Sequence, residues 1–258
     1  MSLSLTMLGR LEITWKGKIP PSLTLRKSQA LLIYLALKPG AHDRSHLAGL
    51  LWGDLPEKNA RRNLRHALHT LRQAIDPEIL ESDRLSTGLN PDTPIRADVL
   101  EFEDALDQAE RHRSVKELDA AIDHLESATV LYQGDFLADF DMDDCLEFEE
   151  WATSRRAHLR VQFLETLDSL VTYWTRRGAY ERALRHARRQ LTLEPLWENS
   201  HRQMMTLLAL TGQRSAALTQ YQICRRILNE ELGLEPLEET INLYRAIQSA
   251  NFAPPDIG

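Results

Sequence analysis

The C-terminal half of the sequence repeats with a period of 34 residues. Gly178 is followed 34 residues later by Gly212, and Ala183 by Ala217. The same spacing relates Leu184 to Leu218 and Ala187 to Tyr221. Each pair falls on a predicted helix that follows a glycine-containing turn. Because a single helical hairpin cannot bury its own apolar face, repeated hairpins stack against one another. The sequence therefore predicts an all-helical C-terminal half.

Thirty-four residues is the length of a tetratricopeptide helical hairpin. Leu167–Trp174 predicts the first helix of one unit, and Glu194-Pro195 its end. The next Glu-Pro pair, Glu235-Pro236, follows after 41 residues instead of 34, so Leu232-Gly233-Leu234 is predicted to belong to an extended turn. A further helix of the same kind is suggested upstream by Ala121, Leu125 and Ala128.

Residues Lys58–Ile75 combine five Lys or Arg with two His and no acid, in a chain whose net charge is -7. At about 100° per residue, the apolar side chains fall in one sector. The sequence therefore predicts an amphipathic helix that begins after Pro56 and ends at Asp76-Pro77. Its apolar sector comprises Ala60, Leu64, Ala67, Leu68, Leu71, Ala74 and Ile75.

The opposite face of this helix carries charge of one sign. It offers no acids for i,i+4 ion pairs, so an anionic partner is expected. A solvated face is the alternative interpretation of such a charge run. The polar side chains predicted to meet the partner are Lys58, Arg62, Asn63, Arg65, His66, His69 and Arg72.

The neighbouring segments predict a winged helix-turn-helix with a small β-sheet, three helices and a C-terminal hairpin wing. Ser45 is the predicted N-cap of the second helix. The predicted elements are strands at Leu3–Trp15 and Ile19–Leu25 around a turn at Lys16–Lys18, helices at Arg26–Leu37 and His46–Trp52, the basic helix, and a hairpin at Ile79–Pro91.

In such domains the third helix enters the major groove of double-stranded DNA, and the preceding helix crosses the backbone. Arg62 and Arg65 have forked donors that suit phosphates or guanine edges. Asn63 and His66, at the edge of the charged face, are predicted to reach base edges. Arg84 in the wing is predicted to contact the adjacent minor groove or backbone.

Charge is distributed unevenly along the chain. Residues 1–97 hold 14 Lys or Arg against 9 acids, residues 98–150 hold 3 against 18, and residues 151–258 hold 14 against 11. Because charges act mainly within about 8–10 Å at physiological salt, the net charge does not exclude DNA binding. The acidic block is predicted to face away from the DNA or to cover the basic helix transiently.

Several short motifs follow one another in a recognisable order. They are Leu50-Leu-Trp52, Ala60-Arg-Arg-Asn-Leu-Arg65, Leu71-Arg72, Leu131-Tyr-Gln-Gly-Asp-Phe-Leu137, Met204-Met205, Gly212, Ala217, Tyr221 and Glu231-Leu-Gly-Leu-Glu-Pro236. With these motifs, nearly the whole chain resembles the SARP-type bacterial transcriptional activators. In that family an OmpR-type winged helix precedes a bacterial transcriptional activator domain (BTAD) of tetratricopeptide-like helices.

The resemblance implies a sequence-specific activator that binds promoter direct repeats as a tandem dimer and contacts RNA polymerase, with a further protein partner on the helical repeats. It also implies three parts: a winged helix over residues 1–97, a BTAD over residues 98–250, and a tail or linker over residues 251–258. The chain has no room for a phosphoacceptor receiver domain. Leu89-Asn-Pro91 replaces the frequent Gly-Tyr element of the wing, as in members followed by a large ATPase region, and Ala253-Pro-Pro255 suggests the start of a linker to such a region.

Metal chemistry has weak support in the sequence. Asp139–Glu150 places carboxylates at positions 1, 3, 5, 9 and 12 of a calcium-loop pattern, but Asp144 stands at position 6, where the sharp turn needs glycine. Acids that precede a helix and are favoured by its dipole are the preferred interpretation. His66 and His69 are spaced to chelate a metal, but no third ligand is evident, so no metal site is predicted.

No catalytic motif, whether a P-loop, a dinucleotide fingerprint, a zinc-protease helix or a nucleophile elbow, occurs in the chain. An enzyme and a cofactor are therefore not expected. Cys145 and Cys224 could form one disulfide but are predicted to be reduced, buried thiols. No apolar run approaches the roughly 18–20 residues of a membrane helix and no signal peptide is evident, so a cytoplasmic protein is expected.

The alternative function is a helical-repeat interaction module whose winged helix binds protein instead of DNA. A protein-binding winged helix does not require a face of one charge sign on its third helix. That face is the sequence feature that separates the two functions.

Overall fold

The computed structural model describes residues 2–249 and 252 and divides the chain into two compact units, residues 1–161 and 162–258. Helix α6 (Leu146–Arg176) runs through the boundary between them. Among the described residues, no helix has the length and apolar content needed to cross a bilayer. The predicted linker element Ala253-Pro-Pro255 lies outside the described residues.

The first unit begins with a three-stranded sheet in the order β2-β1-β6. β1 (Leu3–Thr6) pairs antiparallel with β2 (Glu12–Trp15). β6 (Ile95–Ala97) pairs parallel with β1, so the two ends of the winged-helix segment meet in one sheet. Leu3 and Leu5 alternate with more exposed residues along β1, which places one face of the sheet in the core.

The prediction of a second strand at Ile19–Leu25 is wrong, because both strands of the hairpin lie within Leu3–Trp15. The chain reverses near Gly9, whose φ of +123° is readily adopted only by glycine. A tight turn does form at Lys16–Lys18. The strand does not continue beyond it, because Pro20 and Pro21 have no N–H to donate to a ladder.

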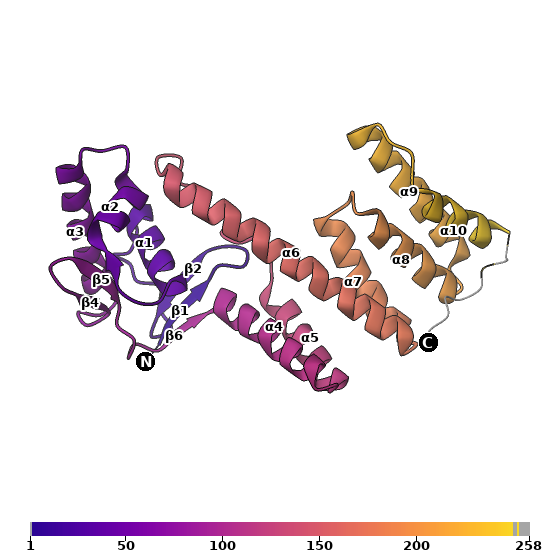
Figure 1. The fold of residues 1–258 in the computed structure, drawn as a ribbon, viewed down its shortest axis with the longest axis horizontal. Coiled ribbons are helices and arrows are strands. Elements are labelled where there is room, and N and C mark those ends of the chain that lie inside the picture. The colour runs from indigo at the N-terminus through magenta and orange to yellow at the C-terminus, as the bar shows by residue number, and fades with distance from the viewer. Residues whose placement is uncertain (1, 250–251, 253–258) are drawn as a thin grey trace. The chain divides into compact units, whose positions relative to one another are not determined.

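Three helices and a second sheet complete the winged helix-turn-helix (Figure 1). α1 (Arg26–Leu37) is the buried helix, and α2 (Arg44–Trp52) and α3 (Glu57–Ala74) both pack against it. The second sheet has the order β3-β5-β4, with strands at His42–Asp43, Ser86–Leu89 and Leu80–Ser82. The predicted wing is the hairpin of β4 and β5.

The N-cap of α2 is Asp43 instead of the predicted Ser45. The Asp43 carboxylate accepts from the backbone N–H groups of Ser45 at 2.6 Å and His46 at 3.2 Å. These two bonds hold the pKa of Asp43 below its ordinary value. Asp43, two residues before Ser45, therefore performs the capping role that was predicted for the Ser45 hydroxyl.

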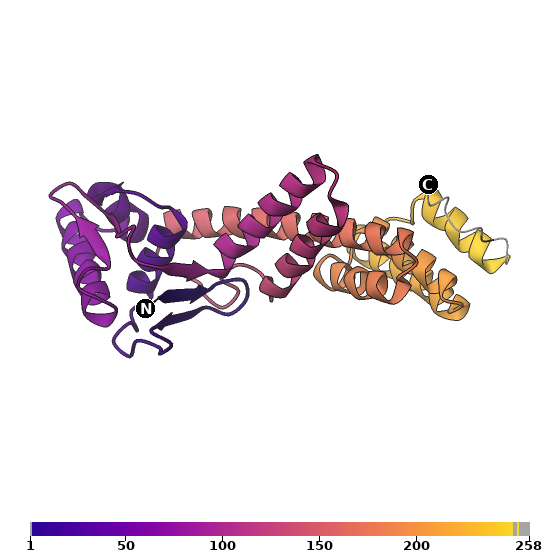
Figure 2. The same ribbon diagram turned by 90° about the horizontal axis from the view of Figure 1, so that it is seen from below.

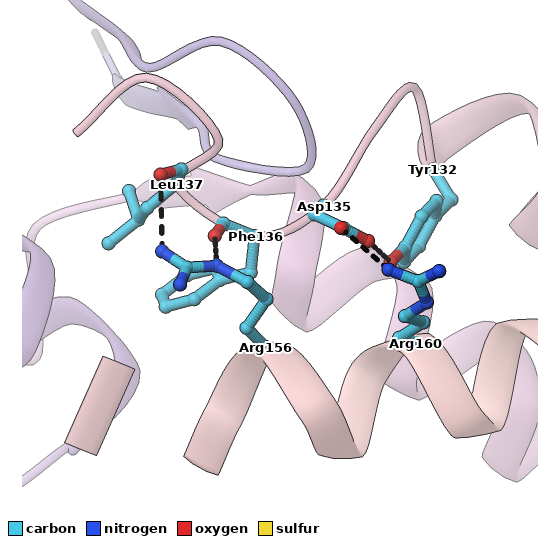
Figure 3. A network of polar contacts seen from close by, with 6 residues as sticks. All are labelled: Tyr132, Asp135, Phe136, Leu137, Arg156 and Arg160. Carbon is cyan, nitrogen blue, oxygen red and sulfur yellow. Dashed lines mark hydrogen bonds and ion pairs between the residues drawn. The ribbon is translucent and has the colours of Figure 1, made fainter. Parts of the chain in front are cut away.

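α4 (Asp98–Ser114) and α5 (Leu118–Leu131) form a helical hairpin, as Figures 1 and 2 show. The segment after α5 bonds to the β1–β2 turn, where Leu137 donates its N–H to the Met7 carbonyl at 2.8 Å. On its other side, Arg156 of α6 donates to the Phe136 carbonyl at 2.8 Å, and Arg160 pairs with Asp135 at 3.2 Å (Figure 3). These bonds join the α4–α5 hairpin and the winged helix in one compact unit.

The described part of the second unit contains the C-terminal part of α6 and four further helices, which pack in succession (Figures 1 and 2). These helices are α7 (Tyr180–Leu193), α8 (Glu198–Leu210), α9 (Arg214–Leu232) and α10 (Glu238–Gln248). Gly178 and Gly212 adopt φ of +71° and +74° in equivalent turns, which explains why glycine recurs at the repeat period. The predicted fold class, a winged helix followed by tetratricopeptide-like helices, is confirmed. Cys145 and Cys224 are both free and buried.

Candidate nucleic-acid interface

α3 is the helix with the strongest separation of apolar and charged faces in the first unit. Pro56 precedes it at the N-cap position, and the N–H of Ile75 ends it by bonding to the Leu71 carbonyl. The residues buried against α1 and α2 are Ala60, Leu64, Ala67, Leu68 and Leu71. This apolar stripe fixes the rotation of α3, so its opposite face points to solvent.

The structure leaves most of the predicted interface residues of α3 exposed and unpaired. Lys58, Arg62, Arg65, His66 and His69 are exposed, while Asn63 and Arg72 are half-buried. In the part of the chain that the structure describes, no side-chain hydrogen bond or ion pair is made by Lys58, Arg62, Asn63, Arg65, His66 or His69. Side chains with unused donors on one solvent-facing helix surface can bind an anion without first breaking an internal contact.

Arg61, on the same helix, differs from these residues because its side chain is paired. Its guanidinium pairs with Glu57 at 2.7 Å, one turn earlier, and donates to the Ser45 hydroxyl at 2.8 Å. Arg61 therefore links the first turn of α3 to the start of α2. It lies outside the predicted set, and its charge is offset by Glu57.

Arg72 connects the end of α3 to the wing. Its guanidinium donates to the Ser82 hydroxyl on β4 at 2.9 Å, and that hydroxyl lies 2.6 Å from the Thr87 hydroxyl on β5. Because a guanidinium carries five N–H donors, this contact leaves others available to a phosphate. The link from Arg72 to Ser82 could not be seen in the sequence, where the two residues belong to separate elements.

The wing presents Arg84 at its tip. Asp83 accepts at 2.7 Å from the backbone N–H groups of Ser86 and Leu85, and these bonds hold the pKa of Asp83 below its ordinary value. Arg44 of α2 donates to the Asp83 carbonyl at 3.0 Å. A preorganised turn thus holds the exposed Arg84 between the two wing strands.

A groove of about 550 Å³ lies beside Asn63 and His66, at the edge of the charged face. The start of α1 forms one wall, and the acidic segment Asp141–Asp144 forms another. Lys27 of α1 pairs with Asp144 at 2.8 Å, and its donated hydrogen bond holds the pKa of Asp144 below the ordinary value. Part of the acidic block is therefore anchored next to α3 instead of facing entirely away from it.

Some of the carboxylates in the calcium-like tract Asp139–Glu150 have protein partners. Asp139 accepts from the Leu11 backbone N–H at 3.0 Å, and Glu149 accepts from the Met142 backbone N–H at 2.5 Å. Within residues 2–249 and 252, no three His, Cys, Asp or Glu side chains gather as a metal site. The tract serves to join loops of the first unit.

The N-terminus of α2 lies next to the first turn of α3, where Ser45 accepts from Arg61. The sequence did not predict a binding role for this helix end. Ser45 and His46 are exposed there. A free helix N-terminus favours phosphate, because its N–H groups lack partners. At α2 the Asp43 carboxylate already accepts from both N–H groups, so this helix end offers little to an anion.

Comparison with known sequences adds independent information. Residues 97–248 match the family described as "Bacterial transcriptional activator domain". The Regulatory protein AfsR of Streptomyces coelicolor is 26% identical over 226 residues, which cover 87% of this chain and 22% of AfsR. The Regulatory protein DnrI of Streptomyces peucetius is 27% identical over 260 residues, which cover 96% of this chain and 93% of DnrI. The chain thus spans about a quarter or less of AfsR but nearly the whole length of DnrI.

A solved structure also has the same fold. Mycobacterium tuberculosis EmbR, in complex with a low affinity phosphopeptide, superposes with a TM-score of 0.71 at 22% identity. The match covers 99% of this chain and 66% of EmbR. At this level of identity the likeness concerns the fold alone.

Proposed function

The chain belongs to the bacterial transcriptional activator domain family, as a SARP-type transcriptional regulator, and we propose that it binds promoter DNA with α3. The single observation that carries this proposal is the charged face of α3. Its polar side chains are exposed or half-buried, and among the described residues all of them except Arg72 lack a side-chain partner, while its apolar face is fixed in the core. Major-groove recognition by a helix-turn-helix needs a helix of this kind.

The side chains divide into two roles in the proposed complex. Arg62, Asn63 and Arg65 lie in the N-terminal half of α3, the part that meets base edges in recognition helices. His66 lies beside Asn63 on the groove side and completes the base-reading set. Arginine forks suit guanine, and asparagine amides suit adenine.

The remaining side chains contact the sugar-phosphate backbone. Lys58 is exposed in the first turn of α3, and His69 is exposed in its C-terminal half. Arg72 and Arg84 belong to the wing side, where they bind phosphate or the adjacent minor groove. Phosphate contacts supply affinity and orientation without sequence information.

The rest of the proposed function follows from the family. Residues 1–97 read promoter direct repeats, two protomers bind in tandem, and the helices of residues 98–250 contact RNA polymerase or another regulatory protein. The stacked helices of the second unit support this assignment, because such arrays present extended protein-binding surfaces.

A selection of bound sequences from random DNA duplexes, made with the full chain, tests this proposal. The chain is expected to enrich one repeated element. The variant R62A/R65A should then lose that preference, because each lost base contact costs about 1–3 kcal/mol. Its melting temperature should remain close to that of the parent, since neither side chain is buried.

Arg61→Ala is the control for the loss of an arginine from the same part of α3. Because Arg61 is engaged by Glu57 and Ser45, this variant should retain the enriched sequence. Unchanged operator affinity in R62A/R65A would instead favour a winged helix that binds protein.

A further inference from the structure

A second groove, of about 420 Å³, lies in the second unit and has no role in the proposed DNA complex. It is formed by side chains of α6, α8 and α10. Its size lies within the range of about 300–1,000 Å³ of small-molecule sites.

The floor of this groove is apolar. Val171 of α6 and Leu207 of α8 are each 1% exposed, and Leu243 of α10 is half-buried beside them. Such a floor favours a ligand with an apolar body, because it removes apolar ligand surface from water.

The walls of the groove are polar and carry only positive charge. The Arg202 guanidinium is oriented by donating to the Thr240 hydroxyl at 3.1 Å and to the side-chain oxygen Oδ1 of Asn199 at 3.3 Å. Arg176 is exposed, and its guanidinium has no ion-pair or hydrogen-bond partner in the described part of the chain. Glu198 lies 3.9 Å from Arg202, but no acid is among the residues that line the groove.

Gln203 adds an incompletely satisfied amide to the same wall. Its Nε2 donates to Asp168 at 2.7 Å, while its Oε1 is buried without a hydrogen-bond partner among the described residues. Buried polar atoms without partners are uncommon in folded proteins. This buried oxygen needs a donor such as a trapped water, and a carboxylate, which only accepts hydrogen bonds, would not bind to it.

We propose that this groove binds a small organic carboxylate with an apolar body. The carboxylate meets Arg176 and Arg202, whose planar forks match its two oxygens. The apolar body lies on Val171, Leu207 and Leu243. This site involves no residue of the DNA interface, so binding of the carboxylate and binding of DNA are separately testable.

The test compares two probes of nearly equal shape, 1-naphthaleneacetate and the neutral 1-naphthaleneacetamide, titrated into the ¹⁵N-labelled full chain. The acid should shift the backbone signals of Thr172, Thr175 and Thr206 saturably. The amide should bind about fivefold more weakly, the size of effect expected from losing a partly exposed ionic contact.

Arg176→Ala should weaken binding of the acid by about the same factor, and it should fold normally because the side chain is exposed. Arg226→Ala removes the same charge from an exposed position of α9 outside the groove and should bind like the parent. The proposal is overturned if the acid gives no saturable shifts, if the shifts lie outside the groove, or if acid and amide bind equally. Equal losses in the two arginine variants would also overturn it.

Discussion

Both carboxylate oxygens of Asp98 accept a hydrogen bond from the backbone N–H of Met7, at 2.9 and 2.8 Å. One of them also accepts from Leu8 at 2.8 Å. Asp98 is the first residue of α4, and Met7 directly follows β1. A single side chain thus fixes the start of the helical region to the N-terminal sheet.

The first prediction concerns this contact. Asp98→Asn should lower the free energy of unfolding by about 2–3 kcal/mol, because the amide has only one acceptor and turns its NH₂ toward a backbone donor. Urea unfolding of the full chain measures the change. Asp104→Asn, which alters an exposed residue of the same helix, should stay within about 0.5 kcal/mol of the parent. Equal stability of both variants would contradict the anchoring role.

The second prediction concerns Arg84 and salt. If Arg84 binds a phosphate, Arg84→Ala should reduce the slope of log K against log[salt] by about 0.9 while the preferred sequence is retained. Fluorescence anisotropy with a labelled operator duplex measures both quantities. Arg226→Ala should leave the slope unchanged. A changed sequence preference would instead assign Arg84 to base recognition.

The third prediction separates two roles of Arg72. Ser82→Ala removes the hydrogen bond that links Arg72 to the wing but keeps the positive charge of Arg72. Arg72→Ala removes both the hydrogen bond and the charge. Operator affinity should therefore fall further in Arg72→Ala, and only that variant should show a salt slope reduced by about 0.9. Equal losses of affinity at unchanged slope would mean that Arg72 acts only by holding the wing.

The fourth prediction concerns the acidic segment beside Asn63 and His66. Replacing Asp141 and Asp143 by asparagine should raise affinity for random DNA at low salt about two- to fivefold, because two negative charges next to the proposed interface are removed. Gel-shift titration of the full chain at low and high salt is the measurement.

The control for this segment is the D104N/D107N variant, which removes two acids from α4 instead. Its affinity for random DNA should change less. The isolated fragment 1–97 is a poorer test, since truncation would remove both the carboxylate of Asp98 that accepts from the Met7 N–H and the Leu137 N–H that donates to the Met7 carbonyl. No gain in D141N/D143N would show that the acidic segment does not oppose DNA binding.

The fifth prediction concerns pH and the second unit. Burial lowers the pKa of His201, whose Nε2 donates to the Pro195 carbonyl at 2.8 Å and whose Nδ1 accepts from Gln220 at 2.7 Å. Below the unfolded pKa of about 6.5, the unfolded chain binds more protons than the folded one. Stability should therefore fall as pH falls from about 6.5 toward the folded pKa.

Thermal melts at about pH 7 and about pH 5 test this dependence. His201→Gln should lower the melting temperature at the higher pH, and should also reduce the difference between the two pH values. An undiminished difference in that variant would assign the pH dependence to another group.

Local sequence patterns determined much of this protein. The bounds of α1, the amphipathic character of α3 and the glycine turns at Gly178 and Gly212 were all predictable, because each depends on residues within a few turns of one another. The exposure of Arg62 and Arg65 follows from the same periodicity. Their contacts with DNA remain predictions.

The tertiary structure alone decided the long-range relationships. β6 pairs with β1 across about ninety residues, and Asp141–Asp144 lies beside α3 from far along the chain. Contacts of Gly9, Asp98 and Leu137 are among the bonds that join the helical region to the sheet and its β1–β2 turn. A periodic pattern reports which face of an element is buried but not which distant segment covers it, because that depends on complementary packing and hydrogen-bond geometry.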